Sequence, residues 1–321
     1  MDQHILPSGI FVSHYNVPRP IGWREQFQND LPLHLEIGFG LGEFLVQQAA
    51  LPVRENFIGI EQDWSRLCKC LSKISAVRAS SNEEEFASNV RLLRLDVTVA
   101  LERLFLPQSL NRVTCLFPCP WPKKTHIKYR LFSRDFLCLL NSRLKDNAKV
   151  SIVTDWQPYL EWMQDEIAAT GFKANVETTR ARFNTKFERK WLAEGQEEFW
   201  ELSLVKQEHR ERQITEDVEL RARFAKNFNP GQFKFENLVG ETSIIYKDFV
   251  FDQEQSLGLV RLVVAEKFLT QHVWVAIIKT KSQWCVAKAD GHSALATAGV
   301  ALAIERVWQA VEQTTGSADN V

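Results

Sequence analysis

Short apolar runs alternate with segments of helical periodicity over the first two thirds of the chain. The apolar runs predict strands at 33–37, 57–61, 90–95, 112–117, 149–154 and 200–206. Helical spacing predicts helices at 42–50, 64–78, 101–105, 134–144 and 158–170. Strands that alternate with helices predict an α/β fold of Rossmann-like class, with a mainly parallel sheet and helices on both faces.

The pattern changes after about residue 206. Residues 207–228 are highly charged, and we expect them to form a helical linker. Short β-branched or aromatic runs at 257–264, 273–279 and 284–288 predict an antiparallel sheet, and apolar residues recur at helical spacing from Val300 to Val311. We therefore divide the chain into an N-terminal segment (1–30), an α/β domain (31–206), the linker (207–228) and a smaller C-terminal α+β domain (229–321).

Composition and charge narrow the choice of function. The 321 residues carry a net charge of −1, so contacts with nucleic acid must come from local clusters. The six cysteines lack the second pair or nearby histidine of a zinc pattern, so we expect free thiols, a cytoplasmic location and no metal. We expect no signal peptide and no membrane contact, since no stretch approaches the roughly 20 apolar residues of a membrane span.

A glycine-rich turn follows the first predicted strand, with Glu36, Gly38 and Gly40 in it. Glycines permit close backbone approach, and ligands of open α/β sheets bind beyond the carboxyl ends of the strands. Glu61 closes the second strand, where a carboxylate accepts ribose hydroxyls, and Asp96 closes the third, near the place of an adenine. Glu36 suits a cation and would repel a pyrophosphate, which favours S-adenosylmethionine over a nicotinamide dinucleotide.

Two basic segments indicate the substrate. Six Lys or Arg residues and no acid lie between Arg112 and Arg134, in a loop where prolines flank Trp121. The second segment, 180–190, holds five basic residues against one acid. Solvated surface is the alternative for both, but the position of the first beside the cofactor end favours contact with phosphates. The residues of that loop that would reach phosphates are Lys123, Lys124, Lys128 and Arg130.

Five motifs in order resemble the bacterial TrmB-type tRNA (guanine-N7)-methyltransferases. They lie at 32–40, 56–61, 120–124, 154–156 and 185–188, and the resemblance runs from about Trp23 to Lys206. It implies the S-adenosylmethionine-dependent methyltransferase fold and methylation of a variable-loop guanosine of tRNA at N7. It also implies cofactor contacts from Glu36, Glu61 and Asp96. The implied tRNA contacts are Lys123, Asp155, Thr185, Lys186, Phe187 and Glu188.

One position departs from the family pattern. The family has Phe-Pro-Asp before Pro-Trp-Pro-Lys, with the Asp taken as catalytic and near the cofactor, whereas this chain has Cys119 there. Guanine N7 has a lone pair and no proton, so the enzyme must orient the reactants and stabilise the charge that appears on the base. Three alternatives stay open. Cys119 acts as a thiolate beside Lys123, Asp155 supplies the missing charge, or the chain is a tRNA-binding protein with weakened catalysis.

The C-terminal domain lies outside most of the resemblance. It contains no constellation of residues that indicates chemistry, and we expect Trp274 and Trp284 in its core. Two roles remain open for it, an extension of the tRNA-binding surface and self-association.

Overall fold

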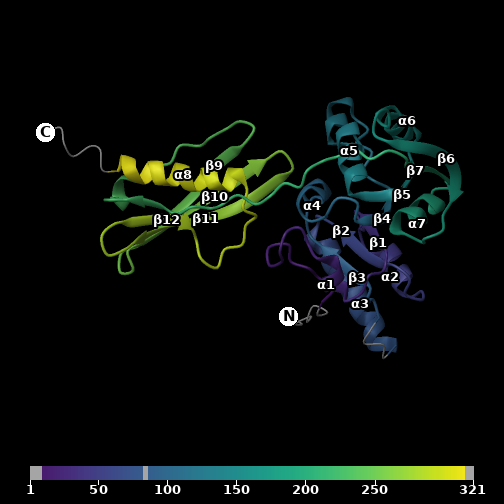
Figure 1. Cartoon of the computed structure of the whole chain (residues 1–321), viewed down its shortest axis with the longest axis horizontal. Helices are drawn as coiled ribbons and strands as arrows, with labels where there is room; N and C mark the ends of the chain where they lie inside the picture. Colours follow the sequence, from purple (N-terminus) through teal and green to yellow (C-terminus); the bar gives the residue numbers. More distant parts are fainter. Residues whose placement is uncertain (1–8, 82–85, 315–321) are drawn as a thin grey trace. The chain divides into compact units, whose positions relative to one another are not determined.

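The computed structural model describes residues 9–81 and 86–314 and shows two compact units, Met1–Thr215 and Glu216–Val321 (Figure 1). Each unit is described by itself. Unit 1 contains α1 (Trp23–Phe27), β1 (Leu33–Ile37), α2 (Glu43–Ala49), β2 (Asn56–Ile60), α3 (Trp64–Ser81), β3 (Val90–Leu93), α4 (Val97–Arg103), β4 (Leu110–Leu116), the 3-10 helix η1 (Lys124–Tyr129), α5 (Arg134–Arg143), β5 (Leu144–Thr154), α6 (Gln157–Glu166), β6 (Phe172–Arg180), α7 (Lys186–Ala193) and β7 (Glu198–Lys206). Unit 2 contains β8 (Arg223–Ala225), the 3-10 helix η2 (Pro230–Gln232), β9 (Ser243–Asp252), β10 (Leu257–Glu266), β11 (Leu269–Lys279), β12 (Trp284–Lys288) and α8 (Ala298–Gln313).

The sheet of unit 1 has the strand order β3-β2-β1-β4-β5-β7-β6. The first five strands in this order pair in parallel, and β7 runs antiparallel to both β5 and β6. The order along the chain reverses between β1 and β4, and such a switch point opens a crevice for ligands beyond the carboxyl ends of the strands. The prediction of a mainly parallel, Rossmann-like sheet is confirmed.

Helices α2 and α3 pack over strands β2 and β3 through one hydrophobic cluster. Leu45 of α2, Leu67 and Leu71 of α3 and Leu92 of β3 are buried in it. The segment before α1 continues this sheet at its edge, because the Leu92 N–H donates to the Ile10 carbonyl at 2.7 Å. The packing holds α2 firmly, and with it the turn between β1 and α2.

The prediction of a helix over 207–228 is wrong. Residues 207–222 form neither helix nor strand, and their backbone is bonded to side chains of α5 instead. The buried Arg143 donates to the Arg212 carbonyl at 2.8 Å. Asn141 donates to the Glu208 carbonyl at 3.0 Å and accepts from the Arg210 N–H at 2.8 Å. These backbone groups are therefore not available for the ladder of a helix.

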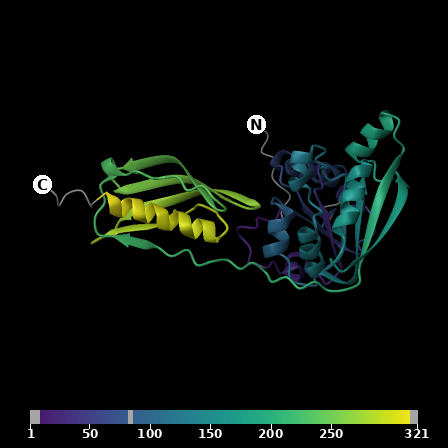
Figure 2. The ribbon, with the colours of Figure 1, turned by 90° about the horizontal axis from the view of Figure 1, so that it is seen from above.

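Unit 2 is an antiparallel sheet in the order β8-β12-β11-β10-β9, and α8 runs along one of its faces (Figure 2). The apolar stripe of α8 from Val300 to Val311 is buried against the sheet, which confirms the predicted smaller α+β domain. Trp284 packs in this core as expected. The expectation for Trp274 is wrong, because it lies outside the core cluster with the Arg261 guanidinium 6.0 Å from its ring centroid.

Both the backbone conformation and the packing at position 42 require glycine, and this requirement can be tested. Its φ is +72°, and a Cβ on it would lie 2.2 Å from the Sγ of the buried Cys70 in α3. We expect Gly42→Ala to lower the free energy of unfolding by about 2–4 kcal/mol, from left-handed strain and overpacking together. Gly38→Ala is the matched control, since its φ is +69° but no atom lies within 4 Å of the added Cβ. Urea unfolding measures both, and equal losses would contradict the packing argument.

Candidate functional site

Glu36 is buried at the switch point, and one oxygen of its carboxylate lacks a hydrogen-bond partner among the described residues. Its side chain is 3% exposed, and its Oε2 has no hydrogen-bond partner among the residues that the structure describes. Burial raises the pKa of Glu36 well above its usual value, and the nearby Glu43 and Glu61 carboxylates raise it further. A buried carboxylate without a partner is costly. The site therefore favours a cation beside Glu36.

The turn after β1 leaves space next to this carboxylate. Gly38 and Gly40 have φ values of +69° and +55°, and a Cβ on either would meet no atom within 4 Å. The Gly38 N–H donates to the Ile60 carbonyl of β2 at 2.8 Å. The Gly40 N–H donates to Glu61 Oε2 at 3.1 Å. The turn is thus held against the end of β2, while its outer side is open to a ligand.

Glu61 and Asp96 lie at the neighbouring strand ends, as the sequence predicts. Glu61 is 7% exposed, and its other oxygen accepts from the Asp63 N–H at 3.0 Å. Asp96 is the N-cap of α4 and accepts from the Thr98 N–H at 2.8 Å. The side-chain amide of Gln62 donates to the second oxygen of Asp96 and so joins the ends of β2 and β3. Sequence reasoning missed Gln62, whose role depends on strand pairing.

The basic loop after β4 turns sharply at two residues. Phe117 and Trp121 have φ values of +54° and +44°, in the left-handed region. Between them, Cys119 is an exposed free thiol. The following lysines, Lys123 and Lys124, are also exposed. This loop follows β4, the parallel neighbour of β1, so it leaves the sheet at the same edge as the glycine turn.

Arg130 holds this loop in place and does not reach outward. It is 8% exposed, and its Nε donates to the Pro120 carbonyl at 2.9 Å. Its guanidinium lies 5.1 to 5.4 Å from the ring centroids of Trp156, Tyr159 and Trp162. Such cation–π contacts stabilise the guanidinium away from water. The prediction that Arg130 binds a phosphate is therefore wrong.

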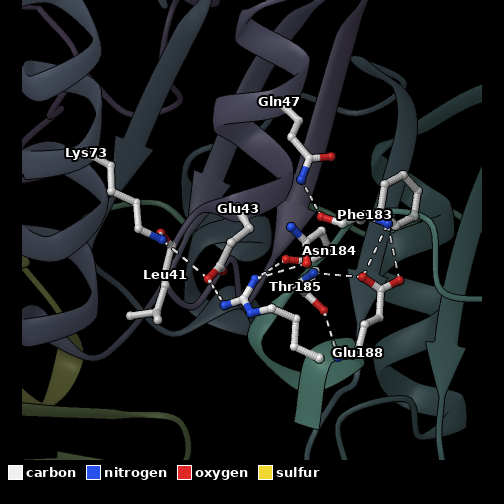
Figure 3. Close-up of polar contacts among 9 residues, drawn as sticks. Leu41, Glu43, Gln47, Lys73, Phe183, Asn184, Thr185 and Glu188 are labelled. Atoms are coloured by element: carbon white, nitrogen blue, oxygen red, sulfur yellow. Dashed lines mark hydrogen bonds and ion pairs between the residues drawn. The ribbon is translucent and has the colours of Figure 1, made fainter. Parts of the chain in front are cut away.

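Glu188 shapes the second basic segment. Thr185 is the N-cap of α7, and Glu188 completes a capping box with it. The Glu188 side chain is 2% exposed, and it accepts from the backbone N–H groups of Phe183 at 3.2 Å and Thr185 at 2.7 Å (Figure 3). It also accepts from the Arg182 N–H at 3.0 Å. A tRNA contact for Glu188 stays a prediction. In the structure its carboxylate fixes the turn that begins α7.

This turn packs on α2, the helix that follows the glycine turn. The rings of Phe183 and Phe44 meet edge-on, with their centroids 5.1 Å apart. The Gln47 side chain donates to the Phe183 carbonyl (Figure 3). Phe187 is 44% exposed, with its ring 6.0 Å from that of Phe117. The predicted cofactor and substrate segments are thus in direct contact.

Asp155 follows β5 and is partly buried. Burial raises the pKa of Asp155 above its usual value. The side-chain amide of Gln196 donates to the Asp155 carbonyl at 3.3 Å, a contact that sequence reasoning missed. Asp155 lines a surface depression together with Trp156, Gln157, Pro158, Gly195, Gln196, Glu197, Glu198 and Trp200.

Residues 30–201 match the family described as putative methyltransferase. A tRNA (guanine-N(7)-)-methyltransferase of Chlorobium phaeobacteroides is 38% identical over 188 residues, which cover 58% of this chain and 88% of that protein. This chain belongs to the tRNA (guanine-N(7)-)-methyltransferase family. A family member of Thermotoga maritima is 34% identical, over 57% of this chain and 58% of that protein.

The matched family region lies within unit 1, so unit 2 is outside it. Among solved structures, the 16S rRNA methyltransferase KamB is 17% identical with a TM-score of 0.44, over 57% of this chain and 92% of that chain. Within residues 9–81 and 86–314, no helix has the length and hydropathy to cross a membrane. The same residues contain no group of three or more His, Cys, Asp or Glu that would hold a metal ion.

The raised pKa of Glu36 predicts a stability effect. The folded state holds the Glu36 proton more tightly than the unfolded state. Protonation of Glu36 therefore stabilises the folded state fully at pH values below the pKa of the unfolded state. This stabilisation is lost as the pH rises through the raised pKa of the folded state. We expect Glu36→Gln to be more stable than wild type near neutral pH, by urea unfolding without ligand. Glu61→Gln, whose carboxylate accepts two N–H groups, is the control and should lose stability. A less stable Glu36→Gln would contradict the interpretation.

Glu188→Ala tests the turn before α7. The variant leaves several backbone N–H groups near the buried position without an acceptor, so we expect it to lose about 1–3 kcal/mol of unfolding free energy. Thermal unfolding measures the loss. Glu194→Ala, at the C-cap of the same helix, is the control, because Glu194 is exposed and its substitution should change the stability little. Equal effects of the two variants would argue against the turn-shaping role.

Proposed function

We propose that this chain transfers a methyl group from S-adenosylmethionine to N7 of a variable-loop guanosine in cytoplasmic tRNA. One observation carries the proposal. A chain of this family holds a buried carboxylate, Glu36, at the switch point of its sheet, and its Oε2 has no hydrogen-bond partner among the described residues. S-adenosylmethionine has a cationic amine and sulfonium, which match the charge that the site requires.

The cofactor would be held by the three strand ends. Glu36 would accept from its amine, while Gly38 and Gly40 let the backbone come close to it. Glu61 would accept the ribose hydroxyls, and Asp96 lies where the adenine is expected. Since Glu61 and Asp96 are already fixed by backbone donors, they are preorganised for these contacts.

The tRNA would bind across the two basic segments. Lys123 and Lys124 are exposed on the loop after β4 and would contact phosphates. Lys186 and Phe187 are exposed at the start of α7, on the turn that Thr185 and Glu188 shape. The depression at Asp155 lies at the carboxyl end of β5. We assign the target base to this depression.

Methyl transfer here needs no general base. When bound, S-adenosylmethionine would supply an electrophilic methyl group to the N7 lone pair: the sulfur–methyl bond breaks as the N7–methyl bond forms, the sulfur leaves as the neutral thioether of S-adenosylhomocysteine, and the positive charge passes to the imidazole ring of the base. Asp155 would stabilise that charge as a carboxylate, so its raised pKa predicts activity that falls as pH is lowered through it. Cys119 stands where the family pattern has its Asp, so we assign it a place beside the reacting atoms, where a cysteine side chain would stabilise the charge less than a carboxylate.

The Cys119 substitution tests this assignment. We expect Cys119→Asp to form 7-methylguanosine about 10²-fold faster than wild type, by analogy with gaining one preorganised electrostatic group. Cys119→Ser is the neutral control and should stay near the wild-type rate. Nucleoside mass spectrometry of an unmodified tRNA transcript gives the rates.

Equal rates for wild type and Cys119→Asp would contradict a limiting role for Cys119. Salt-sensitive tRNA binding without product in wild type, with product in Cys119→Asp, would instead support the alternative function, a tRNA-binding protein with weakened catalysis. That alternative is favoured specifically by the residue at position 119.

A further inference from the structure

Glu43 bonds to cations from two other elements of unit 1. Its Oε1 lies 3.3 Å from the Nζ of Lys73 in α3 and 3.4 Å from the Nη2 of Arg189 in α7 (Figure 3). The Glu43 side chain is 15% exposed, much less than either cation. The position is favourable for a carboxylate, because Glu43 lies in the first turn of α2, at the positive end of the helix dipole.

The Lys73 contact extends to the glycine turn itself. Lys73 donates to the Leu41 carbonyl at 2.9 Å, between Gly40 and Gly42. One ammonium therefore joins the backbone of the cofactor turn to the Glu43 carboxylate. Because Lys73 contacts both groups, a change at the Leu41 carbonyl would act on Glu43 through Lys73.

The Arg189 contact extends to the substrate segment. Arg189 also donates to the Asn184 carbonyl, in the turn that the Glu188 carboxylate fixes (Figure 3). The same turn packs on α2 through Phe183. A continuous series of polar contacts thus runs from Leu41 through Lys73, Glu43 and Arg189 to the start of α7. Its central group is the only carboxylate in the series.

We propose that Glu43 is a positioning residue that couples cofactor binding to tRNA binding, an inference that rests on the proposed function. Cofactor in the turn fixes Leu41 and Lys73, and Glu43 then holds Arg189 and the start of α7 in the arrangement that meets tRNA. Because binding linkage is reciprocal, tRNA on the α7 side tightens the cofactor site by the same factor.

Binding measurements on the full chain test the coupling. The dissociation constant of S-adenosylhomocysteine is measured by calorimetry with and without a saturating unmodified tRNA transcript. For wild type we expect tRNA to tighten binding by about fivefold or more, the lower end of typical coupling between sites. Glu43→Gln keeps the shape but removes the charge, and its coupling factor should fall to nearly one.

Two further variants separate coupling from a local structural effect. Glu194→Gln removes a carboxylate from α7 that pairs only with Lys190 at 3.9 Å among the contacts described, and it should keep wild-type coupling. Arg189→Lys retains the cation and should keep most of the coupling, whereas Arg189→Gln should lose it. A change in the affinity for S-adenosylhomocysteine alone, with the coupling factor preserved, would indicate a merely local role.

The outcomes distinguish this inference from the proposed function. Wild type without coupling, or Glu43→Gln with full coupling, overturns the role of Glu43 even when tRNA is methylated. Absence of 7-methylguanosine with every variant overturns the proposed function. Coupled binding that depends on Glu43 would stand in that case as a property of the two binding sites.

Discussion

The buried carboxylate of Glu36 is the constraint on which the rest of the site depends. It is the next-to-last residue of β1, beside the point where the strand order reverses, and its Oε2 has no partner among the described residues. Neighbouring carboxylates make its ionisation more costly still. Such a buried group lowers the free energy of unfolding. This loss of stability is expected at a binding site, where local strain is part of the function. The glycine turn, its contact with Glu61 and the packing of Gly42 on α3 all hold the backbone around this one oxygen.

Charge in this protein serves two purposes that composition does not distinguish. Arg130 and Glu188 belong to basic segments that indicate a nucleic-acid surface, yet both are buried and both hold backbone. The exposed members of the same segments, Lys123, Lys186 and Phe187, are left to face a ligand. The two segments therefore combine buried charges that hold the backbone with side chains that stay exposed. A separate ion pair joins the second segment to α2, because Glu43 pairs with Arg189 of α7.

Much of the fold was predictable, and the exceptions have physical reasons. Strands β1, β2 and β3 are short runs of mostly buried residues, as expected for strands covered on both faces. Strand β6 was missed because most of its side chains are exposed, so it shows no buried alternation. Helix α7 was missed although Thr185 and Glu188 have the spacing of a capping box, a signal that was available. The extended course after residue 206 depends on Arg143, far away in sequence, and charge content alone gives no sign of it.

The candidate site likewise contains residues that the sequence predicts and residues that it does not. Glu36, Glu61 and Asp96 were predictable because strand ends in a parallel sheet meet at one edge. Gln62 and Gln196 were not, since their partners are set by tertiary contacts.

The most direct test of the account uses S-adenosylmethionine labelled in its methyl group and an unmodified tRNA transcript, followed by nucleoside analysis. The account predicts label in 7-methylguanosine of the variable loop with wild type and its loss with Glu36→Gln. Label in a different nucleoside, or equal labelling by the two proteins, would contradict it.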